Sequence, residues 1–110
     1  MKKRSLLLVG AALAVFLPLT VSPASAASCP KGKVCLWLKR NFEGTHTFRK
    51  LTPGCVGTGI DAGARTVSNQ SGKRISVYSE PGCYGQKVDI KTGHYSSATP
   101  FVITSVAVWG

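Results

Sequence analysis

A short pattern occurs twice in this sequence, and the duplication restricts the possible fold more than any other feature does. The first copy consists of an aromatic residue, four residues, a second aromatic residue, one residue and a glycine: Trp37, Phe42 and Gly44. The second copy begins 41 residues later and has cysteine in place of the second aromatic residue: Tyr78, Cys83 and Gly85. Self-similarity of this kind indicates an internal repeat. A chance recurrence in a chain rich in β-forming residues is the alternative.

A hydroxyl residue follows each copy at a similar distance. Thr66 lies 29 residues after Trp37, and Ser105 lies 27 residues after Tyr78. We interpret each copy as a folded hairpin, because glycine adopts the positive φ of a tight turn without steric cost. The two aromatic residues of the first copy can then pack on each other across the turn. The hydroxyl of Thr66 or Ser105 is suited to hydrogen-bond the backbone of that turn.

The duplicated pattern resembles the Greek-key signature of βγ-crystallin domains. The residues around it are similar to a bacterial family of secreted peptidase inhibitors, family thirty-six, which is typified by a small metalloproteinase inhibitor with a βγ-crystallin fold. The segments that carry this resemblance are residues 29, 35–37, 41–44, 64–69, 77–78 and 83–85. The resemblance implies an all-β, disulfide-stapled sandwich of two Greek-key motifs, one over about 33–70 and one over about 74–110. It also implies a secreted inhibitor of extracellular metallopeptidases.

The N-terminal segment has the organisation of a secretory signal peptide. A basic start at residues 2–4 is followed by an apolar run over residues 6–21, and small residues precede a cleavage site after Ala26. A single membrane anchor is the alternative, but the apolar run is short for a span and ends in a cleavage site. We therefore expect residues 1–26 to be removed on export and residues 27–110 to form one extracellular domain.

The expected mature domain is small, so an apolar core alone would stabilise it only marginally. All four cysteines lie in it, and an even number in a small exported domain indicates disulfides, each contributing roughly 2–4 kcal/mol. Of the three possible pairings, we favour one bond that closes a short N-terminal loop and one that joins the two repeats: Cys29–Cys35 and Cys55–Cys83. A zinc site is the alternative and would require closer ligand pairs together with His46 or His94.

The expected mature domain is also strongly basic. Without the three cations of the leader, eleven Lys and Arg residues face four Asp and Glu residues, so its net charge is about +7. On an exported protein, this charge suits an anionic cell wall, a membrane surface or an acidic partner protein. The extracellular location argues against nucleic acid as a partner. A purely solubilising role of the Lys and Arg residues is the alternative.

Short segments rich in β-branched and aromatic residues predict strands, and no helix of any length is expected. The predicted strands cover residues 34–38, 45–49, 65–68, 75–78, 87–90 and 102–108. Turns containing glycine or proline separate them. Each repeat should contribute four strands, and the two repeats should pack face to face in a sandwich.

The sequence lacks the motifs of common enzymes, such as Gly-x-Ser-x-Gly, His-Glu-x-x-His or a phosphate-binding glycine loop. We expect His46 and His94 at exposed positions and assign no catalytic residue, cofactor or metal. Many βγ-crystallin modules bind calcium, but this chain departs from their pattern. Arg65 stands before Thr66, where a hydroxyl ligand belongs, and the second copy lacks the Asn/Asp pair. We therefore do not expect calcium binding.

A rigid, disulfide-braced loop is the feature that we expect to inhibit a peptidase, because a preorganised loop loses little entropy when it docks. Two loops are candidates, over residues 51–58 and 79–84. Each offers an apolar side chain directly after a cysteine, as thermolysin-like metallopeptidases favour just beyond the scissile bond: Cys55 and Val56 in the first loop, Cys83 and Tyr84 in the second. Ordinary turns stapled by structural disulfides are the alternative for both.

The pattern of cysteines departs from the family that the chain resembles. The inhibitory archetype closes its reactive loop with two nearby cysteines in the second repeat, whereas this chain has only Cys83 there and places the favoured partner at Cys55. A fold is retained across such a change more readily than an activity is. The alternative function is therefore a non-inhibitory, basic βγ-crystallin module that binds cell-wall or membrane surfaces, as an antimicrobial or killer-toxin-like protein would.

Overall fold

The computed structural model describes residues 28–110, which form eight β-strands and contain no helix. The strands are β1 (Val34–Lys39), β2 (Glu43–Arg49), β3 (Gly54–Gly57), β4 (Thr66–Asn69), β5 (Ile75–Glu80), β6 (Tyr84–Ile90), β7 (His94–Ser96) and β8 (Ser105–Val108). Over these described residues, no helix has the length and apolar character needed to cross a membrane. The predicted signal peptide and its cleavage site lie outside the described residues.

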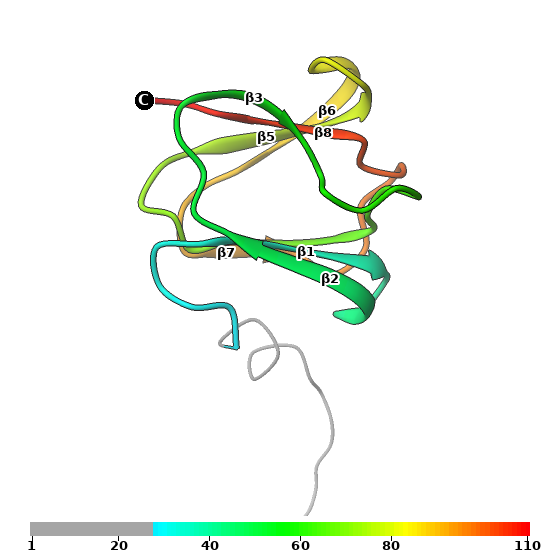
Figure 1. Ribbon diagram of the computed structural model, residues 1–110, viewed down its shortest axis with the longest axis horizontal. Coiled ribbons are helices and arrows are strands. Elements are labelled where there is room, and N and C mark those ends of the chain that lie inside the picture. Colours follow the sequence, from blue (N-terminus) through cyan, green and yellow to red (C-terminus); the bar gives the residue numbers. More distant parts are fainter. Residues whose placement is uncertain (1–27) are drawn as a thin grey trace, which may run out of the picture.

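The strands form two four-stranded antiparallel sheets, which lie one above the other in Figure 1. Their strand orders are β2-β1-β4-β7 and β3-β8-β5-β6. Strand β3 comes from the first half of the chain but pairs with β8 in the sheet of the second half. Strand β7 comes from the second half but pairs with β4 in the sheet of the first half. This exchange joins the two halves of the chain. It confirms the all-β class and is compatible with the βγ-crystallin sandwich that the resemblance implies.

Two of the eight strands were not among the predicted ones. The sequence of β3 contains two glycines, which we interpreted as turn residues, and β7 is only three residues long. Each is held by a neighbour from the other half of the chain, so tertiary pairing outweighs weak local propensity. The strand predicted over residues 102–108 is shorter than expected, because β8 begins only at Ser105.

The apolar core lies between the sheets and follows the period of two that strands impose. Alternate residues of β1, β5 and β8 are almost completely buried in it: Val34 and Leu36, Ile75 and Val77, Val106 and Val108. Cys35 and Trp37 alternate with the core residues of β1, and they form a second buried cluster with Cys29, to which Phe42 and Phe48 are packed. The second cluster therefore stabilises the opposite face of the same sheet.

Candidate functional site

The two copies of the duplicated pattern form the same kind of corner, stabilised by one hydroxyl group each. The N–H of Phe42 donates to Oγ1 of Thr66 (3.2 Å), and the N–H of Cys83 donates to Oγ of Ser105 (2.8 Å). The same hydroxyls donate to the carbonyl oxygens that end β1 (2.7 Å) and β5 (2.6 Å). This is the bonding expected from the sequence at both corners.

The backbone at each corner turns through the left-handed region. Phe42 and Cys83 have φ values of 62° and 63°, and Gly44 and Gly85 have 84° and 88°. At the first corner, the ring of Trp37 meets that of Phe42 edge to face, with centroids 5.0 Å apart. The expected aromatic contact across the turn is therefore present. At the second corner, Cys83 replaces the aromatic residue, and its side chain forms a disulfide instead.

The two disulfides are those that we favoured from the sequence: Cys29–Cys35 and Cys55–Cys83. The second bond joins β3 to the corner between β5 and β6, and its Cα atoms are 6.1 Å apart. Both candidate inhibitory segments therefore lie side by side, although 28 residues separate their cysteines in the sequence. We call the four residues Cys55, Val56, Cys83 and Tyr84 the candidate inhibitory surface.

The first candidate segment is not the loop that we predicted, because the middle of residues 51–58 forms strand β3. This strand lies at the edge of its sheet and pairs only with β8. Nη2 of Arg49 donates to the carbonyl oxygen of Gly57 (2.7 Å), so that carbonyl points away from β8. Backbone groups alternate in direction along a strand, so the N–H and C=O of Cys55 also face the free edge. Val56 is partly buried against the core.

The second candidate segment is a short connection between β5 and β6 that presents Tyr84. The side chain of Tyr84 is 73% exposed, the largest value among the exposed large hydrophobic residues. Hydrogen bonds fix the backbone on either side of Tyr84. The N–H of Cys83 donates to Oγ of Ser105, and the N–H of Gln86 donates to Oγ of Ser79 (2.9 Å). The left-handed φ of Cys83 makes the chain turn here, so this segment is not extended.

The polar side chains considered for metal binding lie apart from one another. His46 is on β2 and His94 on β7, which form opposite edges of one sheet. Among residues 28–110, no three His, Cys, Asp or Glu side chains are grouped closely enough to hold a metal ion. Nη2 of Arg65 donates to the carbonyl oxygen of Thr99 (2.9 Å), so a guanidinium stands where the calcium pattern requires a hydroxyl ligand.

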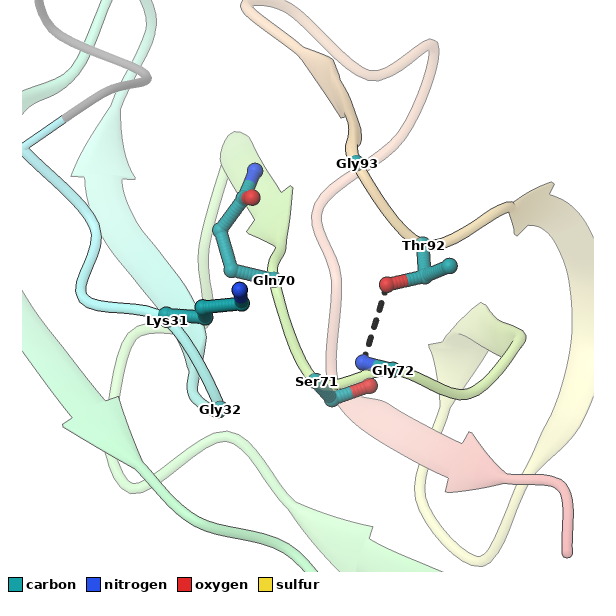
Figure 2. Close-up of a pocket in the computed structure, with 7 residues that line it drawn as sticks. All are labelled: Lys31, Gly32, Gln70, Ser71, Gly72, Thr92 and Gly93. Carbon is teal, nitrogen blue, oxygen red and sulfur yellow. Dashed lines mark hydrogen bonds between the residues drawn. The ribbon is translucent and has the colours of Figure 1, made fainter.

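Three turns form a pocket of about 350 Å³ that we did not predict from the sequence (Figure 2). The turns lie before β1, after β4 and between β6 and β7. The residues that line the pocket are Lys31, Gly32, Gln70, Ser71, Gly72, Thr92 and Gly93. In all three turns a lysine stands within two residues of a glycine: 31–33, 72–73 and 91–93. That recurrence is the one signal in the sequence that could have indicated the site.

The comparisons with known proteins identify the family. No curated protein matches the chain. The model of peptidase inhibitor family I36 matches residues 22–89, which is more than half of the chain. The matched region contains the turn residues of both corners and all four cysteines, and Ser105 of the second corner lies after it. Such a family implies a protein that inhibits peptidases and is not itself an enzyme. The chain therefore belongs to peptidase inhibitor family I36.

Proposed function

We propose that this protein is a secreted inhibitor of extracellular metallopeptidases and that it binds them through the candidate inhibitory surface. Membership in the inhibitor family and the two disulfides support the proposal. The observation that carries it furthest is the Cys55–Cys83 bond. It places an extended strand with free backbone groups next to the most exposed aromatic side chain, and it holds both in position.

The free edge of β3 supplies the part of the surface that resembles a substrate. An extended strand can pair with the edge of a partner's sheet, because its outward N–H and C=O groups form main-chain hydrogen bonds with it. The outward groups of Cys55 are suited to this role. Pairing with β8 and the disulfide already fix the strand, so little conformational entropy is lost on docking. No cofactor is required for this mode of inhibition.

Tyr84 supplies the apolar side chain for the peptidase. Val56 was the corresponding residue of the first segment, but its side chain is half-buried against the core and is less available to a partner. Tyr84 follows a cysteine in the same way and is largely exposed. We therefore assign Tyr84, rather than Val56, to the pocket that accepts an apolar residue just beyond the scissile bond.

Inhibition by two tyrosine variants tests this assignment. Transferring an exposed large apolar side chain into a pocket contributes roughly 1.5–3 kcal/mol. Tyr84→Ala should therefore raise the inhibition constant against a thermolysin-like peptidase by about 10- to 150-fold. Tyr95→Ala is the matched control, because Tyr95 is 40% exposed and lies on β7 in the other sheet. Equal inhibition by both variants would show that Tyr84 does not occupy a pocket of the peptidase. If the unaltered protein inhibits no class of peptidase, the proposed function itself is wrong.

A further inference from the structure

The three turns that form the pocket are positively charged. The turns contain four lysines and no carboxylate: Lys31 lines the pocket, and Lys33, Lys73 and Lys91 are next in sequence to residues that line it. Over the described part of the chain, none of these lysines takes part in an ion pair, since the one ion pair there joins Lys87 to Asp89 (4.0 Å). We call the pocket and these lysines the basic pocket. Its charge is available to an external anion.

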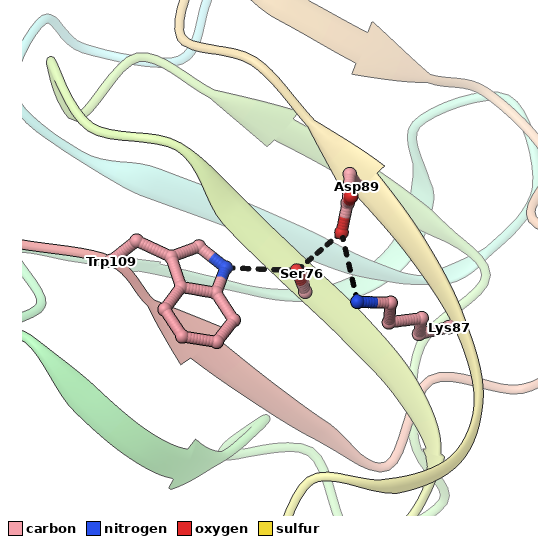
Figure 3. A network of polar contacts seen from close by, with 4 residues as sticks. All are labelled: Ser76, Lys87, Asp89 and Trp109. Carbon is pink, nitrogen blue, oxygen red and sulfur yellow. Dashed lines mark hydrogen bonds and ion pairs between the residues drawn. The ribbon is translucent and has the colours of Figure 1, made fainter.

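Neighbouring charged groups do not neutralise the basic pocket. Arg74 lies over the ring of Trp109, with its guanidinium carbon 5.2 Å from the centroid. Asp89 is the acid closest in sequence to the Lys91 turn. Figure 3 shows that its carboxylate is directed at Ser76 and Lys87, and Oγ of Ser76 donates to it (2.5 Å). The carboxylate of Asp89 is therefore already engaged.

The turns around the pocket are bonded to one another, so the pocket is built rather than incidental. The N–H of Gly72 donates to Oγ1 of Thr92 (2.9 Å), the contact drawn in Figure 2. The N–H of Gly32 donates to the carbonyl oxygen of Gln70 (2.6 Å), and the N–H of Gly93 donates to that of Asn69 (2.7 Å). These bonds link all three turns across the pocket.

Buried Asn69 and three glycines maintain the shape of the pocket. The amide of Asn69 is fully buried and donates to the carbonyl oxygens of Lys73 (2.6 Å) and Ile90 (2.9 Å), beneath two of the turns. The glycines have φ values between 83° and 89°, and a side chain at any of them would meet no atom within 4 Å: Gly32, Gly72 and Gly93. Glycine adopts this left-handed conformation without steric cost, so the three turns can keep their shape.

We propose that the basic pocket binds phosphate groups of an anionic cell-wall polymer. Lysine ammonium groups bind phosphate as point charges and require no fixed geometry of its oxygens. Lys31 is the cation that lines the pocket, the cations next in sequence to its other lining residues are lysines, and Arg74 lies over the ring of Trp109. A volume of about 350 Å³ accommodates a small group such as a sugar phosphate. Several lysines around one pocket suit a polymer that carries repeated charges.

This site is separate from the candidate inhibitory surface and goes beyond the proposed function. Tyr84 is the first residue of β6, whereas the basic pocket adjoins the turn that follows Ile90, the last residue of β6. At about 3.3 Å per residue, the two ends of the strand are roughly 20 Å apart. The protein can therefore hold a cell wall at one end while the other end contacts a peptidase.

Binding to isolated cell walls tests the proposal. The probe is wall material that retains phosphodiester-linked polymer, and the comparison is the same material after hydrofluoric acid has removed that polymer. The test variant is Lys31→Gln/Lys73→Gln/Lys91→Gln. The control, Lys39→Gln/Arg40→Gln/Lys87→Gln, removes the same net charge from exposed positions outside the pocket. Both variants retain the core and the disulfides, and circular dichroism would verify their folding.

We expect the oxidised protein to sediment with the intact walls and not with the stripped ones. The pocket variant should bind at least about tenfold more weakly, and the control variant should lose less than about threefold, because screened surface charges contribute little individually. Millimolar inorganic phosphate should compete. Equal loss in the two variants, equal binding to stripped walls, or no binding at all would each overturn the proposal. The pocket variant should still inhibit peptidases, so this test and that of the proposed function can fail independently.

Discussion

Replacing Thr66 by valine removes the hydroxyl that stabilises the first corner without changing the size of the side chain. Thr66 is completely buried. Its Oγ1 accepts from the N–H of Phe42, and its single hydroxyl hydrogen is shared between the carbonyl oxygens of Lys39 (2.7 Å) and Ser97 (3.0 Å). A buried polar group that loses its partner costs roughly 1–3 kcal/mol. With one donor and two acceptors affected, we expect a loss of about 2–4 kcal/mol in the free energy of unfolding.

Urea denaturation of the oxidised protein, followed by tryptophan fluorescence, measures this loss. For a domain of this size, the expected change corresponds to a decrease of roughly 10–25 °C in Tm. Thr45→Val is the control, because Thr45 is exposed on β2 and forms no hydrogen bond through its side chain within the described residues. A Thr66 variant within about 0.5 kcal/mol of the control would refute the role of the hydroxyl in the corner.

Three further changes test other parts of the structure. Gly85→Ala should cost more than about 1 kcal/mol, because φ is 88° and a side chain would collide with neighbouring atoms of β5; thermal denaturation would detect the loss, and an unchanged Tm would contradict it. The hydrogen bond from Ser76 holds the pKa of Asp89 in the folded protein below its ordinary value. The ionised Asp89 carboxylate therefore stabilises the fold above the ordinary carboxyl pKa, and this stabilisation is lost as pH falls through the lower pKa of the folded state. Asp89→Asn should therefore flatten the acid side of the stability profile, and an unaltered profile would argue against this bond. Replacing Cys55 and Cys83 by serine should lower the stability by roughly 2–4 kcal/mol, measured in urea, and a smaller loss than about 1 kcal/mol would show that the bond does not constrain the unfolded chain.

The corners could be predicted from the sequence because the same pattern of residues occurs twice at nearly matching spacings. A glycine that takes positive φ and a hydroxyl that bonds the turn leave a visible spacing in the chain, and the structure has these interactions at Thr66 and Ser105. The strand predicted over residues 34–38 from its β-branched and aromatic residues is also present, as β1.

The edge strands and the basic pocket could not be predicted, because they depend on residues far apart in the chain. Strand β3 contains two glycines and becomes a strand only by pairing with β8, about fifty residues later. We therefore predicted a loop where the strand lies and considered Val56 as an apolar side chain for a peptidase, whereas that side chain is half-buried. The basic pocket combines three separate turns, none of which has a distinctive motif of its own.

Titrating a thermolysin-like metallopeptidase with the oxidised protein tests most directly whether the surface around the Cys55–Cys83 disulfide inhibits a peptidase. We predict that peptidase activity falls linearly with added protein and vanishes near one equivalent, and that the variant with serine at both cysteine positions inhibits more weakly. Full peptidase activity in the presence of a micromolar excess of the folded, oxidised protein would contradict the account. Equal inhibition by the serine variant would show that inhibition does not depend on this disulfide.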